Sequence, residues 1–520
     1  MKQPSTPKKI IIIGAGISGL SAGIYGRKAG FDVEIYEKNP SVGGLCTSWV
    51  RKGYTIDGCI HWLTGTKPGS DLYRMWQDVG AFKSEEDIIR SDTFGILEYN
   101  GQRLRMWNDS DKLEKEMLRI APEEKRRIKK FIKLFKKIEK VDFPLHMPTD
   151  TMNFFELTAV GLRMLPMLGA LGYAAMKSTR SYAKKFKNPL LKYFVTNIVP
   201  GRNNLYANMF SYATVSSGNG GVPVGGSKPM VERMLQTYKD LGGKIFLAKE
   251  VEKVIVDGKV AKGIKLKNGT ESYADYIVSS TDILHTLKHL LDHQYRSHRF
   301  FSRLNNVRRY PIPSCVYVTF SVDVKKYRDL HLTETYQFNT KPFVVGYTVQ
   351  ESIRLRDYSY DESFIHNGRV PVNVLISQSD INYPFWKLLS KDRKAYLIEK
   401  ERIGNILKEK IEQHFPSLEG DLELLDVVTP FTYHRYCNSS YGGYMSFSWT
   451  DENNMLMHNG KIRGVKNFYV AGQWLQMPGG LPLALSSGKF SIQRIMKKEH
   501  MNFRITPKKD NKKGGKENGK

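Results

Sequence analysis

The chain has 520 residues, of which 41% are hydrophobic and 25% are charged, and this composition excludes low-complexity and wholly disordered proteins. Its length predicts about two to four domains. With 80 lysines and arginines against 52 aspartates and glutamates, the formal net charge is +28, which favours anionic partners but does not choose among nucleic acid, acidic lipid and phosphorylated ligands.

The first predicted element is a buried strand followed by a glycine-rich turn. Residues 10–13 are all isoleucine, and such a β-branched run predicts a strand buried on both faces. The turn has G-x-G-x-x-G spacing and leads into a helix-compatible stretch, after which residues 32–36 predict a second strand ending at Glu37. Strand, turn, helix, strand and acid together form a dinucleotide-binding fingerprint. Its turn includes Gly14, Gly16, Ser18 and Gly19.

Each member of this fingerprint has a physical role. Gly14 permits the tight turn, Gly16 lets the backbone approach a pyrophosphate, and Gly19 lets the helix pack closely on the strand. The helix N-terminus offers free N–H groups and the positive end of its dipole to the phosphates. Glu37 can accept hydrogen bonds from a ribose 2′-OH and would repel a 2′-phosphate, so NADP is disfavoured at this site.

Two adjacent glycines follow the second strand. Gly43 and Gly44 lie on the loop after Glu37, where they leave room for backbone N–H contacts to a phosphate. A nicotinamide-binding unit alone does not need this extension.

Residues 123–140 form a basic amphipathic segment. One face carries an apolar stripe, and the other is nearly all lysine and arginine. Three interpretations stay open: a helix packing on the protein's own core, a helix lying on a membrane surface, and a nucleic-acid contact, for which no accompanying motif exists. The stripe consists of Ile128, Phe131, Ile132, Phe135 and Ile138.

The next segment, residues 157–176, is apolar and has Arg163 as its single charge. It is long enough to span a bilayer, but three glycines and a proline interrupt it. We expect a tunnel-lining or shallowly inserted element, with a transmembrane helix or plain core as alternatives. Basic residues follow it, as anchoring on anionic lipid would require.

The middle of the chain contains a second glycine turn and a run of strands. Gly225, Gly226 and Ser227 precede a predicted helix, and residues 244–247, 250–256, 260–266 and 276–279 predict strands joined in part by Asp-Gly and Asn-Gly turns. His285, His289 and His293 follow at helical spacing. Because no glutamate accompanies them as in H-E-x-x-H, we predict a structural stripe and no metal site.

The C-terminal part repeats the pattern of strand, glycine turn and helix. Residues 467–471 predict a short buried strand, Gly472 follows, and residues 483–497 predict a helix. This arrangement makes another anion or dipole site. The turn between strand and helix also contains Gly479, Gly480 and Leu481.

These motifs, in this order, resemble those of the phytoene desaturase family, which includes carotenoid isomerases and retinol saturases. The resemblance implies an α/β protein with a glutathione-reductase-type (Rossmann-like) FAD-binding fold, a discontinuous α+β substrate domain, and FAD held non-covalently. It rests on residues 14–19, 37, 43–44, 54–58, 224–227, 250–251, 435–436 and 469–481, which span nearly the whole chain.

The same resemblance divides the chain and assigns further cofactor contacts. It implies that Val251 presents its backbone to adenine, that the turn at Gly472 lies beside the flavin, and that the helix start at Gly480 and Leu481 faces the pyrimidine end. The expected divisions are a FAD-binding domain of residues 1–77, 216–298 and 426–500, a substrate and membrane-facing domain of residues 78–215 and 299–425, and a disordered basic tail of residues 501–520.

The implied activity is FAD-dependent oxidoreduction of C–C or C=C bonds in a polyene, isoprenoid or other lipid-like substrate, by hydride exchange with flavin N5. Desaturation, saturation and isomerisation all stay open, since Leu45 stands where bacterial phytoene desaturases often carry arginine. Two alternatives remain: an amine-oxidase-type flavin oxidase, and a non-catalytic prenyl-lipid-binding protein on the same fold.

No motif sets the catalytic side chains. His61 lies where the family's chain passes near the flavin, and His434 and Tyr441 precede the C-terminal flavin segment. Each could protonate a substrate carbon or simply line the cavity.

The expected partners are a hydrophobic polyene or lipid and a membrane surface, without nucleic acid. One dinucleotide fingerprint leaves NAD(P) only as a diffusible reductant, and the electron donor or acceptor stays open. Four cysteines without a C-x-x-C pair indicate a reducing compartment. We therefore expect a cytoplasmic protein, peripheral on the membrane, with residues 157–176 at the substrate entrance.

Overall fold

In the computed structural model, which describes residues 7–141, 145–199, 201–292, 302–303, 305–332 and 334–502 (the side chains of residues 166, 167 and 170 excepted), the N-terminal fingerprint opens a five-stranded parallel sheet. The isoleucines of its central strand point alternately into two separate cores, as a strand buried on both faces requires. The strand order is β10 (Lys244–Phe246), β2 (Asp32–Tyr36), β1 (Lys9–Ile13), β14 (Tyr276–Ser279) and β20 (Phe468–Val470).

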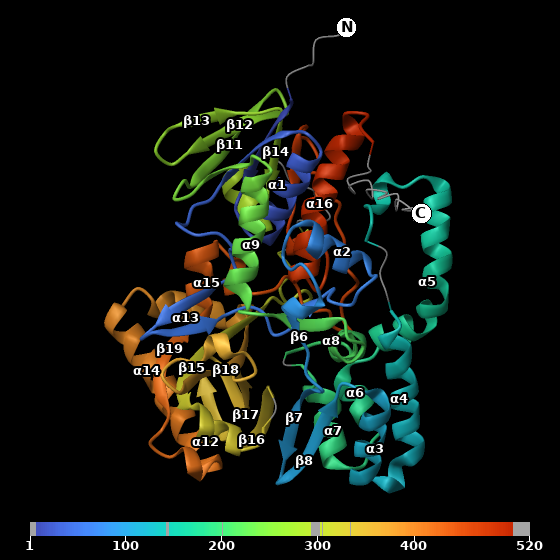
Figure 1. Cartoon of the computed structure of the whole chain (residues 1–520), viewed down its shortest axis with the longest axis vertical. Helices are drawn as coiled ribbons and strands as arrows, with labels where there is room; N and C mark the ends of the chain where they lie inside the picture. The colour runs from blue at the N-terminus through green and yellow to red at the C-terminus, as the bar shows by residue number, and fades with distance from the viewer. Residues whose placement is uncertain are drawn as a thin grey trace, which may run out of the picture.

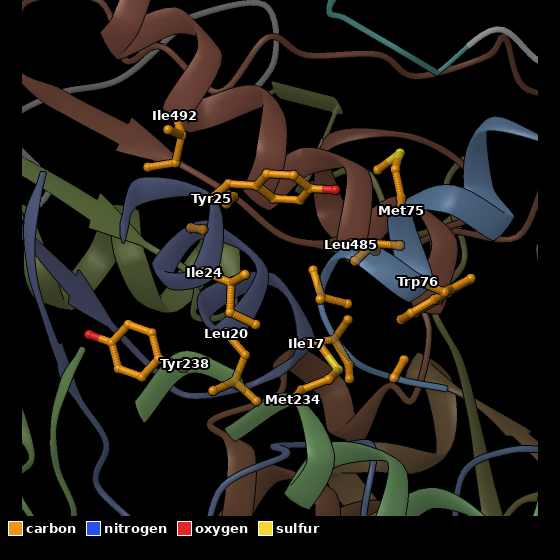
Figure 2. Packing of buried hydrophobic residues seen from close by; sticks show 14 of the residues in the cluster. Ile17, Leu20, Ile24, Tyr25, Met75, Trp76, Met234, Tyr238, Leu485 and Ile492 are labelled. Atoms are coloured by element: carbon orange, nitrogen blue, oxygen red, sulfur yellow. The ribbon is translucent and has the colours of Figure 1, made fainter. Parts of the chain in front are cut away.

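Helices cover one face of this sheet. Helix α1 (Ile17–Lys28) is buried on nearly all sides because α9 (Ser227–Asp240) and α16 (Leu481–Lys498) both pack against it. Figure 2 shows the side chains of these helices and of α2 (Asp71–Asp78) that meet in the shared core. A Cβ on Gly488 of α16 would lie 2.4 Å from the carbonyl oxygen of Ser18 in α1, so glycine permits this close approach.

An antiparallel meander covers the opposite face of the parallel sheet. It consists of β11 (Val251–Asp257), β12 (Val260–Leu266) and β13 (Glu271–Tyr273), which lie at the top of Figure 1. The predicted strands at residues 244–247 and 276–279 also form, but as β10 and β14 they pair in parallel with β2 and β1. Two of the four predicted strands therefore extend the parallel sheet and do not belong to the meander.

A second sheet of seven strands lies at the other end of the molecule (Figure 1). It is antiparallel except between β16 and β7. Its core-facing side packs against α12 (Val324–Asp329), α13 (Tyr383–Leu389) and α14 (Arg393–His414). The strand order is β19 (Glu423–Val428), β15 (Pro313–Asp323), β18 (Arg369–Ser379), β17 (Thr348–Asp357), β16 (Thr335–Val345), β7 (Thr93–Tyr99) and β8 (Gln102–Trp107).

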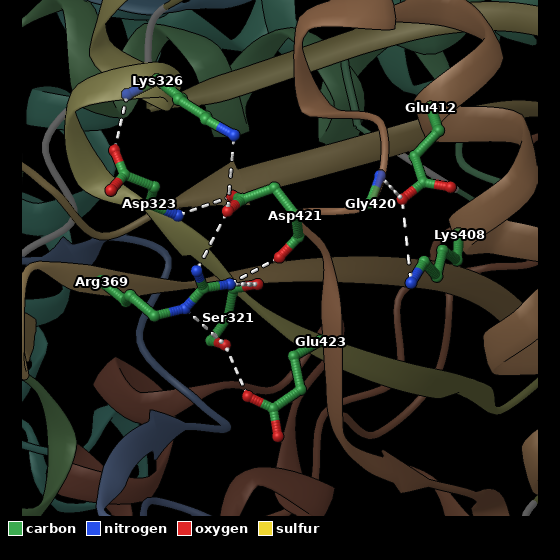
Figure 3. A network of polar contacts seen from close by, with 9 residues as sticks. All are labelled: Ser321, Asp323, Lys326, Arg369, Lys408, Glu412, Gly420, Asp421 and Glu423. Atoms are coloured by element: carbon green, nitrogen blue, oxygen red, sulfur yellow. Dashed lines mark hydrogen bonds and ion pairs between the residues drawn. The ribbon is translucent and has the colours of Figure 1, made fainter.

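A polar network fixes one end of this sheet (Figure 3). Arg369 of β18 donates to the Asp421 carboxylate at 3.0 Å and to the Ser321 carbonyl of β15 at 3.0 Å. The same carboxylate accepts the Asp323 amide at 2.8 Å. Three neighbouring segments are thus held in register by one half-buried guanidinium.

A cluster of helices lies beside the second sheet (Figure 1). Its members are α3 (Ser110–Ile120), α4 (Lys125–Glu139), α5 (Phe154–Ala175), α6 (Thr179–Ala183), α7 (Pro189–Asn197) and α8 (Leu205–Ser216). The apolar stripe predicted on residues 123–140 is buried in that cluster, and Ile128, Phe131 and Phe135 are fully inaccessible. The stripe therefore packs on the protein's own core. Its interpretation as the lipid-contacting face of a membrane-surface helix is wrong, because α3 and α8 already cover it.

Helix α5 contains the apolar segment of residues 157–176 and runs along the outer edge of the molecule (Figure 1). Among the described residues, no helix combines the length and apolarity needed to cross a membrane. The helix begins at a capping box between Asn153 and Glu156, in which each side chain accepts from the other's backbone N–H. The transmembrane alternative is therefore not supported for this segment.

Short elements join the two halves. They are the hairpin β3 (Ser48–Arg51) and β4 (Tyr54–Asp57), the small sheet β5 (Leu63–Thr64), β9 (Gly220–Pro223) and β6 (Ile88–Ile89), and the helices α10 (Ile283–His285) and α15 (Pro430–Cys437). The predicted histidine stripe begins in α10 and continues in a π-helical turn, Thr286–Leu290. Its third member, His293, lies outside the described residues.

The Asp57 carboxylate connects these halves. Its side chain accepts hydrogen bonds from the amide of Ser227 at 2.6 Å, from the Ser227 hydroxyl at 2.7 Å, and from the amides of Cys59 and Ile60. The backbone carbonyl oxygen of Asp57 accepts from Asn373 of β18 and from Tyr358, which directly follows β17. Burial raises the pKa of the Asp57 carboxyl, and the hydrogen bonds oppose that shift.

We expect Asp57→Asn to lower the free energy of unfolding by about 2 kcal/mol, because an amide NH₂ would then face the Ser227 N–H and one charge-assisted hydrogen bond would be lost. Ser227→Ala, which removes only the hydroxyl, should cost about 1 kcal/mol. Chemical denaturation of both variants and the parent protein measures the difference. An Asp57→Asn protein as stable as the parent would contradict this role.

Candidate functional site

A cavity of about 1220 Å³ lies between the two sheets and receives residues from both. At one end it is bounded by the turns that follow β1, β2, β14 and β20, at the carboxyl edge of the parallel sheet. Open α/β sheets bind their ligands at this edge. The N-termini of α1 and α16 also line the cavity, so two helix starts with free N–H groups face the same space.

The residues predicted to bind the cofactor gather in this cavity with one exception. Gly19 is not among the lining residues; a Cβ there would lie 2.0 Å from the Gly14 carbonyl oxygen, so its role is the close packing of α1 on the turn. The lining residues are Gly14, Gly16, Ser18, Glu37, Gly43, Gly44, Val251, Gly472, Gly479, Gly480 and Leu481.

Glycine geometry tests whether a dinucleotide fits. A Cβ on Gly16 would meet nothing closer than 3.8 Å, and one on Gly472 nothing closer than 3.9 Å, although both residues line the cavity. A Cβ at either position would therefore come no closer than ordinary van der Waals contact with the protein, although the φ of +142° at Gly472 favours glycine there. No side chain covers the backbone at the turns where a pyrophosphate would need to approach it. The residues present therefore fit the cofactor.

Glu37 directly follows β2 and lies at the cavity wall, as the fingerprint predicts. Its two carboxylate oxygens accept from the Ala15 amide at 2.8 Å and from the Asn39 amide at 2.8 Å. A second bond, from the Asn39 side-chain amide at 2.9 Å, goes to the oxygen that accepts the Asn39 N–H. The oxygen that accepts from Ala15 therefore keeps acceptor capacity for a ribose hydroxyl.

The second sheet forms the other end of the cavity, where His61 also lies. His61 Nε2 is 3.4 Å from the Tyr317 hydroxyl, and the two rings are stacked. Burial, together with the charges of Arg356 and Arg354, lowers the pKa of His61 to about 3. The imidazole is therefore neutral at physiological pH, which excludes an imidazolium as the ground-state proton donor.

The other two catalytic candidates are not among the cavity-lining residues. His434 Nδ1 lies 3.1 Å from the Ser439 carbonyl oxygen, and its ring packs against Tyr383. Tyr441 also packs against Tyr383. His434 lies on α15 and Tyr441 follows that helix. Neither lines the cavity, so of the three candidates the geometry brings only His61 there.

Sequence reasoning did not single out the polar residues that β15, β17 and β18 contribute to the cavity. These strands carry charged or polar side chains at alternate positions, and the intervening residues enter the apolar core. The sequence did contain a signal for them. Arg354 and Arg356 alternate with Ile353 and Leu355, and because side chains of a strand alternate between its two faces, both arginines lie on one face. The polar cavity residues are Tyr317, Arg354, Arg356 and Asn373.

Apolar and aromatic side chains form the rest of the wall. They come from β7, α5, α8 and the segment before β20, so the cavity extends from the glycine turns to the outer helix α5. In the part of the chain that the structure describes, no three His, Cys, Asp or Glu side chains gather as metal ligands would. The wall includes Trp62, Phe94, Val160, Met164, Tyr206, Phe210, Phe447 and Trp449.

The parallel sheet with its bare glycine turns and two helix N-termini defines a dinucleotide-binding flavoprotein fold. The profile of the flavin-containing amine oxidoreductases matches residues 17–496, and the chain belongs to that family. It is therefore an FAD-dependent oxidoreductase.

Known relatives agree with this placement. A lycopene-forming phytoene desaturase of Paracoccus sp. (strain N81106 / MBIC 01143) is 23% identical over 94% of this chain and 97% of its own length. A 4,4′-diapophytoene desaturase of Methylomonas sp. is 22% identical over 96% of this chain and 97% of its own. The solved cyclohexylamine oxidase of Brevibacterium oxydans shares the fold, with a TM-score of 0.55 and 16% identity over 95% of this chain and 100% of its own.

Gly16→Ala and Gly19→Ala should separate cofactor binding from folding. Gly16→Ala is expected to keep the melting temperature of the apoprotein, because its Cβ comes no closer than 3.8 Å to another atom, and to weaken FAD binding by at least about tenfold. Gly19→Ala should lower stability by about 2 kcal/mol or more through overpacking. Thermal unfolding of apoprotein and fluorescence titration with FAD measure the two effects; equal FAD affinity in Gly16→Ala and the parent would contradict the assignment.

Proposed function

We propose that the protein oxidises, reduces or isomerises C–C or C=C bonds of a polyene, isoprenoid or other lipid-like substrate. The observation that carries this proposal is the single cavity that continues from the cofactor turns into an aromatic-lined space reaching α5. Flavin N5 supplies hydride transfer when FAD is bound. The whole-length likeness to two carotenoid desaturases supports the substrate class.

The chain's own residues would orient the substrate and exclude water. Aromatic side chains such as Trp62, Phe94 and Phe210 can hold an extended apolar chain, and each covered CH₂ contributes about 0.8 kcal/mol to binding. His61, neutral and within reach of the Tyr317 hydroxyl, is the candidate for accepting or passing a proton at Nε2. NAD(P) enters this proposal only as a diffusible reductant.

The proposal keeps the division of the chain stated above. Residues 1–77, 216–298 and 426–500 would bind FAD, and residues 78–215 and 299–425 would hold substrate. The amine-oxidase alternative is weaker, because two guanidiniums, Arg354 and Arg356, line the cavity and would repel an ammonium ion. A non-catalytic lipid carrier is weaker too, since the bare turns at Gly16 and Gly472 are those a bound dinucleotide needs.

We further propose that the protein works in the cytoplasm at an anionic membrane surface, which α5 contacts. Its outward face exposes Phe154 by 77%, Phe155 by 82% and Leu162 by 62%, and no other described segment covers them. The inward residues Val160 and Met164 line the cavity, so α5 separates the cavity from its surroundings. Exposed basic residues follow the helix and complement acidic lipid: Lys177, Arg180, Lys184, Lys185 and Lys187.

The substrate proposal is tested with the FAD-loaded protein under anaerobic conditions. Phytoene in phosphatidylcholine vesicles should bleach oxidised flavin, or retinol should reoxidise the dithionite-reduced flavin. Phe210→Ala should lower kcat/KM about tenfold or more through lost apolar contact, whereas the exposed Tyr347→Ala should not. A flavin that responds to amines and to neither polyene would contradict the proposal.

The membrane proposal is tested by flotation with vesicles of phosphatidylcholine and phosphatidylserine. Phe154→Ser combined with Phe155→Ser should reduce the bound fraction about tenfold or more, because two large apolar side chains lose their insertion. Leu388→Ser is the matched control, since Leu388 is 67% exposed on α13. Equal loss in both variants, or equal binding to vesicles without phosphatidylserine, would count against α5 as the anionic-membrane contact.

A further inference from the structure

Strand β17 places two arginines in the cavity wall. Ile353 and Leu355 enter the apolar core beneath the sheet, and the residues between and after them, Arg354 and Arg356, line the cavity. Alternate residues of a strand project from one face about 7 Å apart. The two guanidiniums therefore belong to the same region of the substrate end, beside neutral His61.

Neutral acceptors take up only some of the hydrogen-bond donors of these two guanidiniums. Arg354 donates to the Gln337 side chain at 2.8 Å and to the carbonyl oxygens of Asn197 and Ile198. Arg356 is 7% exposed, and its Nη2 donates to the Tyr360 hydroxyl at 3.2 Å. Its Nε is buried without a hydrogen-bond partner.

The neighbouring carboxylates are engaged elsewhere. Asp57 accepts from Ser227 and from the turn after β4, Asp357 accepts from Ser359, and Glu334, which also lines the cavity, bonds to Ser91. Among the described residues, neither guanidinium is in an ion pair with any of them. Glu334 attracts Arg356 without forming an ion pair with it, and no described carboxylate contributes to the pKa of Arg354. A buried charge without a close charged partner costs several kcal/mol, so the two guanidiniums, and Arg354 above all, can still accommodate a negative charge.

Both arginines remain charged at neutral pH. Burial lowers the pKa of Arg354 to about 10, which is still well above physiological pH. A pure hydrocarbon in this cavity would further desolvate both cations without offering them an acceptor. An acidic group would give them one.

We propose that the substrate of this cavity is an apolar chain that ends in a carboxylate, and that Arg354 and Arg356 bind this carboxylate. The inference rests on the proposed lipid-like substrate and narrows it. Planar guanidiniums suit the task, because they bind carboxylates through paired, charge-assisted hydrogen bonds. The turns that fit the FAD pyrophosphate belong to the parallel sheet, at the opposite end of the cavity, which leaves the arginines for the substrate.

The test is equilibrium binding of a fluorescent polyene acid, cis-parinaric acid, and of its methyl ester to the FAD-loaded protein. The two ligands share one chain and differ in charge. We expect the acid to bind at least about tenfold more tightly than the ester. Arg354→Gln and Arg356→Met should each reduce that preference to about threefold or less and leave ester binding unchanged.

Arg119→Met is the control for the general loss of one positive charge, because Arg119 is exposed, does not line the cavity, and contacts Glu116 of α3 and the Arg103 carbonyl oxygen; it should keep the preference for the acid. If Arg356→Met does not fold, Arg354→Gln carries the test alone. Equal affinity for acid and ester in the parent protein would overturn the carboxylate site and leave the lipid-like substrate standing. If the protein bound neither ligand, both proposals would fail.

Discussion

Buried Asp57 is the residue on which both halves of the molecule depend. Its carboxylate holds the N-terminus of α9, and its backbone carbonyl oxygen accepts from Asn373 of the second sheet and from Tyr358, which directly follows β17. The space is so tight that a Cβ on Gly226 would lie 2.2 Å from the carboxylate. Because His61 follows four residues later, the position of the one cavity-facing catalytic candidate relative to the cofactor turns is set by this contact.

The cavity combines two chemically different ends. One is made of bare backbone and helix starts, which suit an anionic cofactor. The other is a sheet face with guanidinium, phenol and amide groups, flanked by aromatic walls. Exclusion of water from such a cavity strengthens the electrostatic interactions within it, so an enclosure that would protect hydride transfer would also strengthen the carboxylate contact that we propose for the arginines.

Local sequence was enough to predict the cofactor half, and insufficient for the substrate half. Each of the turns at Gly14–Gly19, Gly43 and Gly472 is a short continuous segment, and its glycines are needed for local backbone reasons. The place of these turns at the cavity could therefore be predicted. From sequence alone, the apolar stripe on α4 could face a membrane or the protein core. Only the packing of α3 and α8 against it shows that it faces the core. His434 looked close to the flavin segment, but closeness along the chain does not fix direction; its ring turns toward Tyr383.

The close contact of α1 with α16 has a consequence for the order in which the protein can fold during synthesis. Residues 17–28 are synthesised long before their neighbours in α16 and β20, from which almost the whole described chain separates them. Until they leave the ribosome, the sheet lacks its β20 edge and α1 keeps an apolar side open to water. The parallel sheet and its helices therefore cannot close before α16 has been made, and free FAD meets a complete set of glycine turns only after that point.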